Sequence, residues 1–465
     1  MFRIVLKAVI NALALVVSPC WSLLTIVTRW TSAVKQELFT RRRLKFSALG
    51  VISQEFNKTG ELDDLIGQDE KKERLTPSEV LTNASVLISL ARLSYEPNET
   101  IQNVLQRSWG IPINTDPDHP NYYFISVIDT QAFIIETLHH IIVVFRGTEP
   151  FNLRDWGTDR LFRMRPLAPT SSSNYLNLDH LKVAMAHSGF LDALEVFDFK
   201  QSSKCCLIEI YAHLCKVLQK RTENKSIFIC GHSLGGGLAS VFSFMLEMIS
   251  EQLQQQQQQL HPSSMNFIDV RKHLAGVYTF GAPRVFNDEA CRQHASKIIG
   301  KRTFRFVHDH DVVPQLPNYD PNNPDTFETP QNCVTKTLRI FLNFMTDGSC
   351  PRPYFHIGKA FQFKKLSSHE DDDRKLYSLK VMNALVPQEG SSMHMAVNQA
   401  PPMETLLEVE VREPPKPWIK RVLDFIGKVS VPYIMDHHPD GYENCCIAFR
   451  NALLKQEENM VVGNE

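Results

Sequence analysis

The chain has 465 residues and a formal net charge of −1 at pH 7, with 43% hydrophobic and 22% charged residues. That balance is typical of a globular protein, and the length suits one large α/β domain with additions or two domains. The near-zero net charge argues against a nucleic-acid-binding protein. The ten cysteines show no spacing typical of metal ligands, so the sequence predicts no metal site.

The N-terminal part of the chain contains a stretch, residues 8–27, without a single charged side chain. About 20 apolar residues are enough to cross the core of a bilayer. More basic residues follow this stretch than precede it, which favours a cytosolic body. We therefore expect residues 1–45 to be a membrane anchor, or a hairpin bent at Pro19, at an endomembrane or a lipid droplet. A signal peptide cleaved on secretion and a buried helix are the alternatives.

The rest of the chain is organised as a polar linker over 46–75, a main domain over 76–450 and a tail over 451–465. Strand and helix patterns alternate in the main domain, which predicts an α/β fold with a mainly parallel or mixed sheet and helices on both faces. We expect helices over 77–95, with Thr76 as N-cap, and over 187–199 and 207–220. We expect strands over 122–130, 132–136, 141–145, 226–230, 275–281 and 302–308.

Two stretches of unusual composition interrupt this pattern. We expect six consecutive glutamines, residues 254–259, to lie at the end of a helix or in a loop. Residues 366–416 combine an acidic run with a region rich in proline, serine and methionine, which predicts a partly disordered insert. A further helix over 418–431 would lead the chain back to the core.

The most informative motif is Gly231-His232-Ser233-Leu234-Gly235, a G-x-S-x-G between an apolar strand and a helix of small residues. This strand–turn–helix context is that of the nucleophile elbow of an α/β-hydrolase. A serine hydroxyl is a weak nucleophile, and a sharp turn presents it to a base while the helix N-terminus faces the developing negative charge. The alternative is a glycine-rich turn with a passenger serine.

An elbow serine needs an acid and a histidine that follow it in the chain. Asp309 and Asp311 come directly after the predicted strand 302–308, where strand ends of such folds carry their sites. His356, His437 and His438 follow further on.

Five sequence blocks, taken together, resemble the class 3 (fungal-type) lipases of the α/β-hydrolase superfamily. The blocks cover about 130–317, with a weaker continuation to about 450, and the N-terminus and the insert are similar to the oil-body type of this family. The blocks are I-I-V-V-F-R-G-T at 141–148 with Asp155-Trp156 and Thr158-Asp159, H-S-G-F at 187–190, the elbow, T-F-G-A-P-R-V at 279–285 and D-V-V-P-Q-L-P at 311–317.

The resemblance assigns a role to each matched residue. Ser233 would be the nucleophile and Asp311 the acid, with Asp309 as an alternative that is otherwise a solvated loop carboxylate. His437, five residues before Tyr442, would be the base, with His438 and His356 as alternatives; a histidine in the block around His356 is usually structural in this family. His232 and His308 are expected to be packing residues.

The oxyanion hole would use two donors. The motif itself places one at the backbone N–H of Leu234, and the resemblance places the other at Thr148, which is otherwise a turn residue. Residues 157–186 would hold a lid or an ordinary surface loop, and its apolar side chains would be Trp156, Leu161, Phe162, Met164 and Leu167.

Together these residues predict a serine lipase that hydrolyses the carboxylester bonds of acylglycerols through an acyl-serine intermediate. No metal or cofactor is implied. The expected partner is a lipid substrate at a membrane or lipid-droplet surface. A phospholipase A1 and a non-catalytic scaffold with a lipase fold are the alternatives.

Overall fold

The computed structural model describes residues 75–114, 121–147, 164–167, 183–195, 205–219, 225–259, 268–311, 313–316, 354–367, 374–383, 404–412 and 437–462. Residues 1–74, which contain the expected anchor and all but the last residue of the expected linker, lie outside this set, as do the expected helix over 418–431 and Thr148. Among the described helices, none combines the length and the hydropathy that a bilayer-crossing segment needs.

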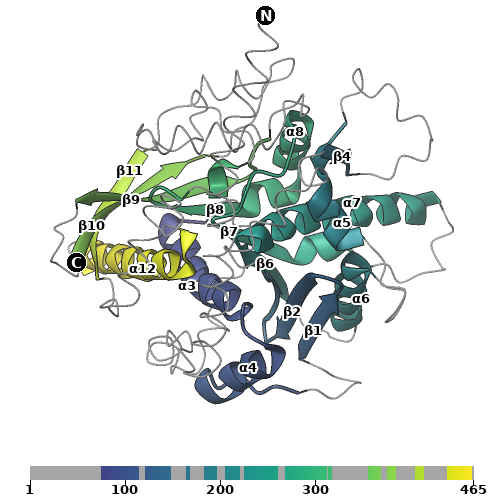
Figure 1. Ribbon diagram of the computed structural model, residues 1–465, viewed down its shortest axis with the longest axis horizontal. Helices are drawn as coiled ribbons and strands as arrows, with labels where there is room; N and C mark the ends of the chain where they lie inside the picture. The colour runs from purple at the N-terminus through teal and green to yellow at the C-terminus, as the bar shows by residue number, and fades with distance from the viewer. Residues whose placement is uncertain are drawn as a thin grey trace, which may run out of the picture. The chain divides into compact units, whose positions relative to one another are not determined.

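A mixed nine-stranded sheet forms the centre of the described structure, in the order β1-β2-β3-β6-β7-β8-β9-β10-β11 (Figure 1). Its middle strands, β3 to β9, run parallel, and an antiparallel pair of strands lies at each edge. The strands are β1 Tyr122–Val127, β2 Thr130–Glu136, β3 His140–Phe145, β6 Ser226–His232, β7 Leu274–Phe280, β8 Thr303–His308, β9 Lys359–Ser367, β10 Arg374–Met382 and β11 Glu404–Arg412.

β3 and β7 are largely apolar along their length, which is typical of strands covered on both faces. All residues of β3 and β7 are buried. In the register of the sheet, Phe145 lies opposite Gly231 and His232 lies opposite Phe280. The carboxyl ends of β3, β6 and β7 therefore meet at one edge of the sheet.

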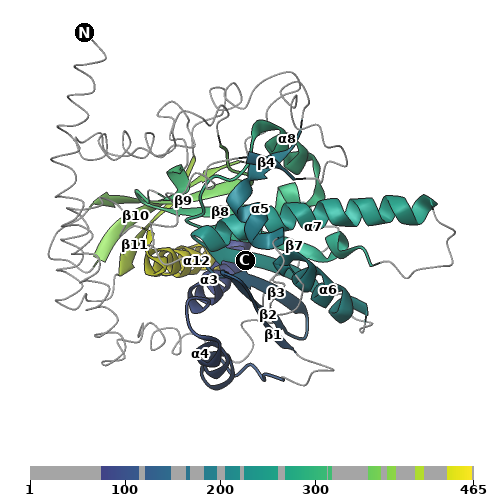
Figure 2. The same cartoon turned by 45° about the vertical axis from the view of Figure 1, so that its right-hand side comes forward.

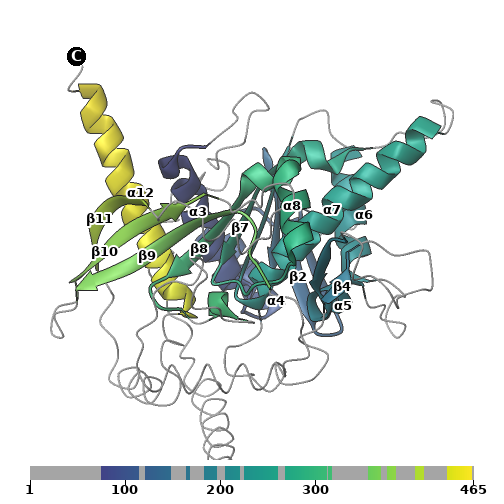
Figure 3. The same ribbon diagram turned by 90° about the horizontal axis from the view of Figure 1, so that it is seen from above.

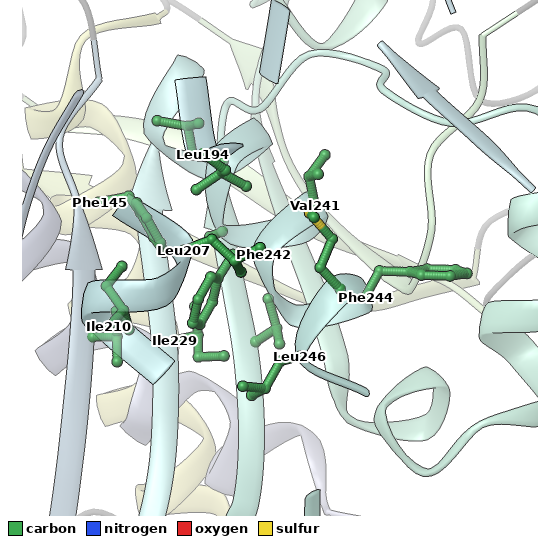
Figure 4. Close-up of a cluster of buried hydrophobic side chains, with 14 of the residues drawn as sticks. Phe145, Leu194, Leu207, Ile210, Ile229, Val241, Phe242, Phe244 and Leu246 are labelled. Carbon is green, nitrogen blue, oxygen red and sulfur yellow. The ribbon is translucent and has the colours of Figure 1, made fainter. Parts of the chain in front are cut away.

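The helices cover both faces, as predicted (Figures 1 and 2). On one face lie α5 (Ser188–Glu195), α6 (Cys206–Gln219) and α7 (Leu234–Gln259), and α8 (Asp288–Ser296) follows β7. Figure 4 shows the core on this side, where Phe145 and Ile229 of the sheet pack with Leu207 of α6 and Phe242 of α7.

On the other face, α3 (Pro77–Leu93) packs against β3, β6 and β7 and also against α12 (Pro439–Val462) (Figure 3). Thr76 caps α3, as the sequence indicated, and Glu79 completes a capping box with it. Tyr278 of β7 accepts a hydrogen bond from Asn83 of α3 at 3.0 Å. Shorter elements complete the described structure: α4 (Asn98–Asn103), a π-helical turn (Val104–Ser108) and a small sheet of β4 (Met164–Pro166) with β5 (Met185–His187).

The prediction of a partly disordered insert over 366–416 is wrong for two segments of this range. β10 and β11 lie within that range and extend the main sheet beyond β9. In the second half of β11, Glu408 and Glu410 alternate with Leu407, Val409 and Val411, which is the period-two pattern of a strand. The acidic and proline-rich composition around these strands masked this pattern. The expected tail also differs, because α12 continues to Val462.

The six glutamines 254–259 form the end of α7, one of the two positions expected for them. The described structure is thus an α/β-hydrolase fold, in which β6 leads directly into α7 at the expected elbow.

Candidate active site

Ser233 occupies the turn between β6 and α7 in a strained conformation. Its φ of +59° is in the left-handed region, which a non-glycine residue rarely adopts, and the residue is buried. A Cβ on Gly231 would collide with the backbone of Gly235, and a Cβ on Gly235 would collide with the carbonyl oxygen of Phe145. The two motif glycines are therefore required by close backbone contacts around the serine.

The elbow is anchored to neighbouring strands and to its own helix. The backbone N–H of Ser233 donates to the carbonyl oxygen of Phe280 at 2.8 Å, and Gly236 N–H donates to the Ser233 carbonyl at 2.9 Å. Leu234, the expected oxyanion donor, is the first residue of α7, where backbone N–H groups have no partner within the helix.

Thr148, the other expected oxyanion donor, lies one residue beyond the described part of the chain. Gly147, just before it, is described and passes close to the elbow. A Cβ on Gly147 would collide with the Tyr95 hydroxyl and lie 2.5 Å from the His232 carbonyl oxygen. The segment that leads to Thr148 therefore runs directly beside the nucleophile turn.

Asp311 is fully buried and accepts hydrogen bonds on both carboxylate oxygens. Its Oδ2 accepts from His437 Nδ1 at 2.7 Å and from the hydroxyl of Tyr442, and its Oδ1 accepts from Val313 N–H at 2.9 Å. Gly281, at φ +59°, lets the backbone approach this group, because a Cβ there would lie 2.8 Å from Asp311 Oδ2 and 2.9 Å from the His437 ring.

Asp309, the alternative acid, makes different contacts. Its carboxylate lies 3.1 Å from His310 Nδ1 and accepts from Lys365 N–H at 3.2 Å. Burial alone raises the pKa of Asp309, but the hydrogen bond and charge of His310 outweigh it and hold the pKa below its ordinary value. The structure therefore brings Asp311, and not Asp309, to His437.

His437 lies two residues before α12 and is buried. With Nδ1 engaged by Asp311, its Nε2 is buried and has no hydrogen-bond partner among the described residues. An imidazole held in this way has Nε2 as the nitrogen that accepts a proton.

The two alternative histidines have other neighbours. His438 Nδ1 lies 3.3 Å from Asp440 Oδ1 and accepts from the Asp440 backbone N–H. His356 Nε2 lies 2.6 Å from the Pro314 carbonyl oxygen and therefore donates to it. Burial, then the charges of Arg305 and Arg284, lower the pKa of His356 well below its ordinary value, so this ring is neutral.

His232, inside the motif, supports the backbone of His437. Its Nε2 lies 2.8 Å from the His437 carbonyl oxygen and must donate to it, so its Nδ1 accepts from the Tyr95 hydroxyl at 2.9 Å. Burial lowers the pKa of His232 well below its ordinary value, and the nearby His437 lowers it further. The ring is thus a neutral hydrogen-bonding bridge, consistent with the expected packing role.

Of the other residues with an expected role, some are described by the structure and some are not. Trp156, Leu161 and Phe162 of the expected lid lie outside the described residues. Leu167 is buried in the main core, and its N–H donates to the Ala184 carbonyl at 3.0 Å. His308, expected to be structural, packs with Tyr442 and Tyr377.

Two residues at the site were not assigned a role from the sequence. Tyr442 was noted only as the context of His437, and Tyr95 only as the end of a predicted helix. A tyrosine in the sequence is a weak signal of such a role, because tyrosine hydroxyls find many kinds of partner.

The described fold and its elbow are those of an α/β-hydrolase, and comparison with known proteins shows which proteins this chain is similar to. Residues 142–320 match the family Lipase (class 3). Triacylglycerol lipase OBL1 of Arabidopsis thaliana is 28% identical over 265 residues, which are 50% of this chain and 45% of that protein.

A second curated relative and a solved structure are also similar to this chain. Triacylglycerol lipase OBL1 of Ricinus communis is 27% identical over 293 residues, covering 57% of this chain and 52% of that protein. The chain thus spans about half the length of these curated relatives. The solved structure of Rhizomucor miehei triacylglyceride lipase is 16% identical at a TM-score of 0.39, covering 80% of this chain and 98% of that one.

Proposed function

We propose that this protein is a serine lipase that hydrolyses the carboxylester bonds of acylglycerols and releases fatty acids. The observation that carries the proposal is the buried pair of His437 and Asp311, joined at 2.7 Å at the end of the sheet where the strained Ser233 lies. Two relatives are named triacylglycerol lipases, which supports an acylglycerol substrate.

In the proposed mechanism, Ser233 Oγ attacks the ester carbonyl carbon while His437 Nε2 takes the hydroxyl proton. Asp311 orients the imidazole and stabilises its protonated form. The backbone N–H of Leu234 stabilises the oxyanion, and Thr148 is the second proposed donor.

Collapse of the tetrahedral intermediate breaks the carbon–oxygen bond to the alcohol, which leaves with the proton from His437. Water, deprotonated by His437, then attacks the acyl-serine, and the fatty acid departs as the proton returns to Ser233. The strained turn at Ser233 presents the hydroxyl for both steps.

The test is fatty-acid release from a triacylglycerol emulsion by the wild type and by Ser233→Ala. Ser240→Ala is a matched control, because Ser240 lies on α7, the helix that follows Ser233. Among the described residues, its hydroxyl donates only to the Gly236 carbonyl. Loss of release in Ser233→Ala with retention in Ser240→Ala would support the proposal. Release from phospholipid vesicles alone would favour a phospholipase A1, and no release from either by the wild type would favour the scaffold.

We also propose that residues 1–45 hold the protein at a membrane or lipid-droplet surface. The uncharged stretch 8–27 supports this proposal. Flotation of the full chain with phosphatidylcholine vesicles should be strong for the wild type and weak for Leu13→Asp/Leu15→Asp. Equal flotation of both proteins would contradict the proposed anchor.

A further inference from the structure

The interface between α3 and α12 contains an unusual cluster of buried charges close to His437. Arg92, near the end of α3, contacts two carboxylates in the first turns of α12. Its two terminal nitrogens lie 2.5 Å from Glu443 Oε2 and 2.8 Å from Asp440 Oδ1. Ser89, one turn earlier on α3, donates to Glu443 Oε1 at 2.5 Å.

This cluster is withdrawn from solvent. The side chains of Arg92, Glu443 and Asp440 are 10%, 6% and 23% exposed. Burial raises the pKa of the Glu443 carboxyl, and the charge of Arg92 opposes this shift. A buried ion pair adds little net stability compared with apolar packing, but it has strict geometric requirements. Such a cluster is therefore better suited to fixing the relative position of two helices than to raising the free energy of unfolding.

The position that the cluster controls is the start of α12. Asp440 and Glu443 are three residues apart and thus lie on one face of the helix, toward α3. Tyr442, between them, donates from the same turn to Asp311. The first turn of α12 is thereby tied to α3 on one side and to Asp311 on the other.

His437 lies two residues before this turn and is joined to the end of α3 by a second set of contacts. Its carbonyl oxygen accepts from His232, which in turn is bonded to Tyr95, just after α3. The backbone at His437 is therefore held by the hydrogen bond from His232 and by the ion pairs of Arg92 with α12, and this backbone places the His437 side chain. A rotation of α12 by a small angle would move His437 Nδ1 away from Asp311.

We propose that Arg92 is a positioning residue for His437, acting through Asp440 and Glu443. Its two-pronged guanidinium fixes the rotation of the first turn of α12, so that the imidazole meets both Asp311 and the elbow serine. This inference rests on the proposed hydrolase function, and it adds a residue that lies outside the matched lipase blocks.

The test compares substitutions at the two ends of the same interface. Arg92→Met removes the clamp. Arg450→Met is the matched control, because Arg450 donates to Ser85 of α3 at 3.0 Å but lies three turns further along α12. Arg92→Lys keeps the charge and folds more readily, yet a single ammonium cannot reproduce the planar two-pronged contact.

The expected result is a loss in kcat with little change in KM. With a soluble ester such as p-nitrophenyl butyrate, we expect Arg92→Met to lower kcat between about 10- and 100-fold, because small misplacements of reacting groups have effects of this size. Arg92→Lys should be intermediate, and Arg450→Met should keep kcat within about twofold of the wild type. Thermal unfolding midpoints show whether the two methionine variants are similarly folded.

A second readout does not depend on activity. The proton between His437 Nδ1 and Asp311 should give a low-field proton resonance, assigned by its absence in His437→Gln. We expect this resonance to shift or broaden in Arg92→Met and Arg92→Lys and to persist in Arg450→Met. If the wild type hydrolyses no ester, the proposed function fails, and this resonance still decides whether Arg92 positions His437.

The proposal is overturned if Arg92→Met and Arg92→Lys retain both the wild-type kcat and the wild-type resonance. It is also overturned if Arg450→Met lowers kcat and perturbs the resonance as much as Arg92→Met does. Either result would reduce Arg92 to an ordinary contact between two helices.

Discussion

His437 Nδ1 lies 2.7 Å from Asp311 Oδ2, although the two residues are 126 positions apart in the chain. Both side chains are almost completely buried, and the same carboxylate oxygen also accepts from Tyr442. This contact joins the end of β8 to the start of α12 beside the strained turn at Ser233. Most of the testable consequences of the structure follow from it.

Asp311→Asn should lower kcat by about 10³- to 10⁴-fold, because an amide stabilises the wrong tautomer of the facing imidazole. The kcat for a soluble ester measures this effect. Asp309→Asn is the control, since Asp309 contacts His310 and Lys365 instead, and it should remain close to the wild type. A larger loss in Asp309→Asn than in Asp311→Asn would show that the acid is misassigned.

Tyr442→Phe should lower kcat about tenfold, the equivalent of about 1.4 kcal/mol, because Asp311 loses one of its donors. Tyr278→Phe is the matched control. It removes a buried tyrosine hydroxyl that accepts from Asn83, on the same face of the sheet, so it should lower the free energy of unfolding but leave kcat unchanged. Equal kcat values for the two variants would mean that Tyr442 only packs.

Gly281→Ala should lower kcat, and it should shift or broaden the low-field proton resonance of His437. The new Cβ would lie 2.8 Å from Asp311 Oδ2 and would push the carboxylate away from the ring. Gly358→Ala introduces similar backbone strain, at φ +85°, but its Cβ meets Thr303. Both variants should unfold at a lower temperature, and an unaltered kcat in Gly281→Ala would contradict the close approach.

The stability of the protein should fall in mild acid partly because of His294. Burial, with a smaller contribution from Lys297, lowers the pKa of His294 from 6.5 to about 3. Below pH about 6.5 the unfolded chain takes up a proton here that the folded chain excludes, so the free energy of unfolding decreases by about 1.4 kcal/mol per pH unit. This loss continues until the pH approaches the folded pKa.

Urea unfolding at pH 7, 6 and 5 tests this assignment. His294→Gln removes the titrating group, so its free energy of unfolding should depend less steeply on pH than that of the wild type. The kcat should not change, because His294 contacts Thr303 and lies outside the proposed active site. Identical pH slopes for the two proteins would show that His294 is protonated in the folded state.

Much of the fold was predictable because its signals are local. The apolar runs at 141–145 and 275–281 predicted strands, which the structure confirms as β3 and β7. Thr76 marked the start of α3 for the same reason, since an N-cap side chain bonds to a backbone N–H only two or three residues later. β10 and β11 are nine residues each but were missed, because the acidic and proline-rich segments around them dominate the composition of that stretch.

The sequence by itself determined the elbow: its glycines, its strand and its helix are adjacent in the chain, and close backbone contacts permit little else at Gly231 and Gly235. It left the partners of the serine open among two aspartates and three histidines. Only the tertiary structure decided that His437 faces Asp311 and that Arg92 holds the turn that follows. Neighbours such as His437 and His438 point in different directions, and contacts between residues more than a hundred positions apart depend on how the helices pack on the sheet.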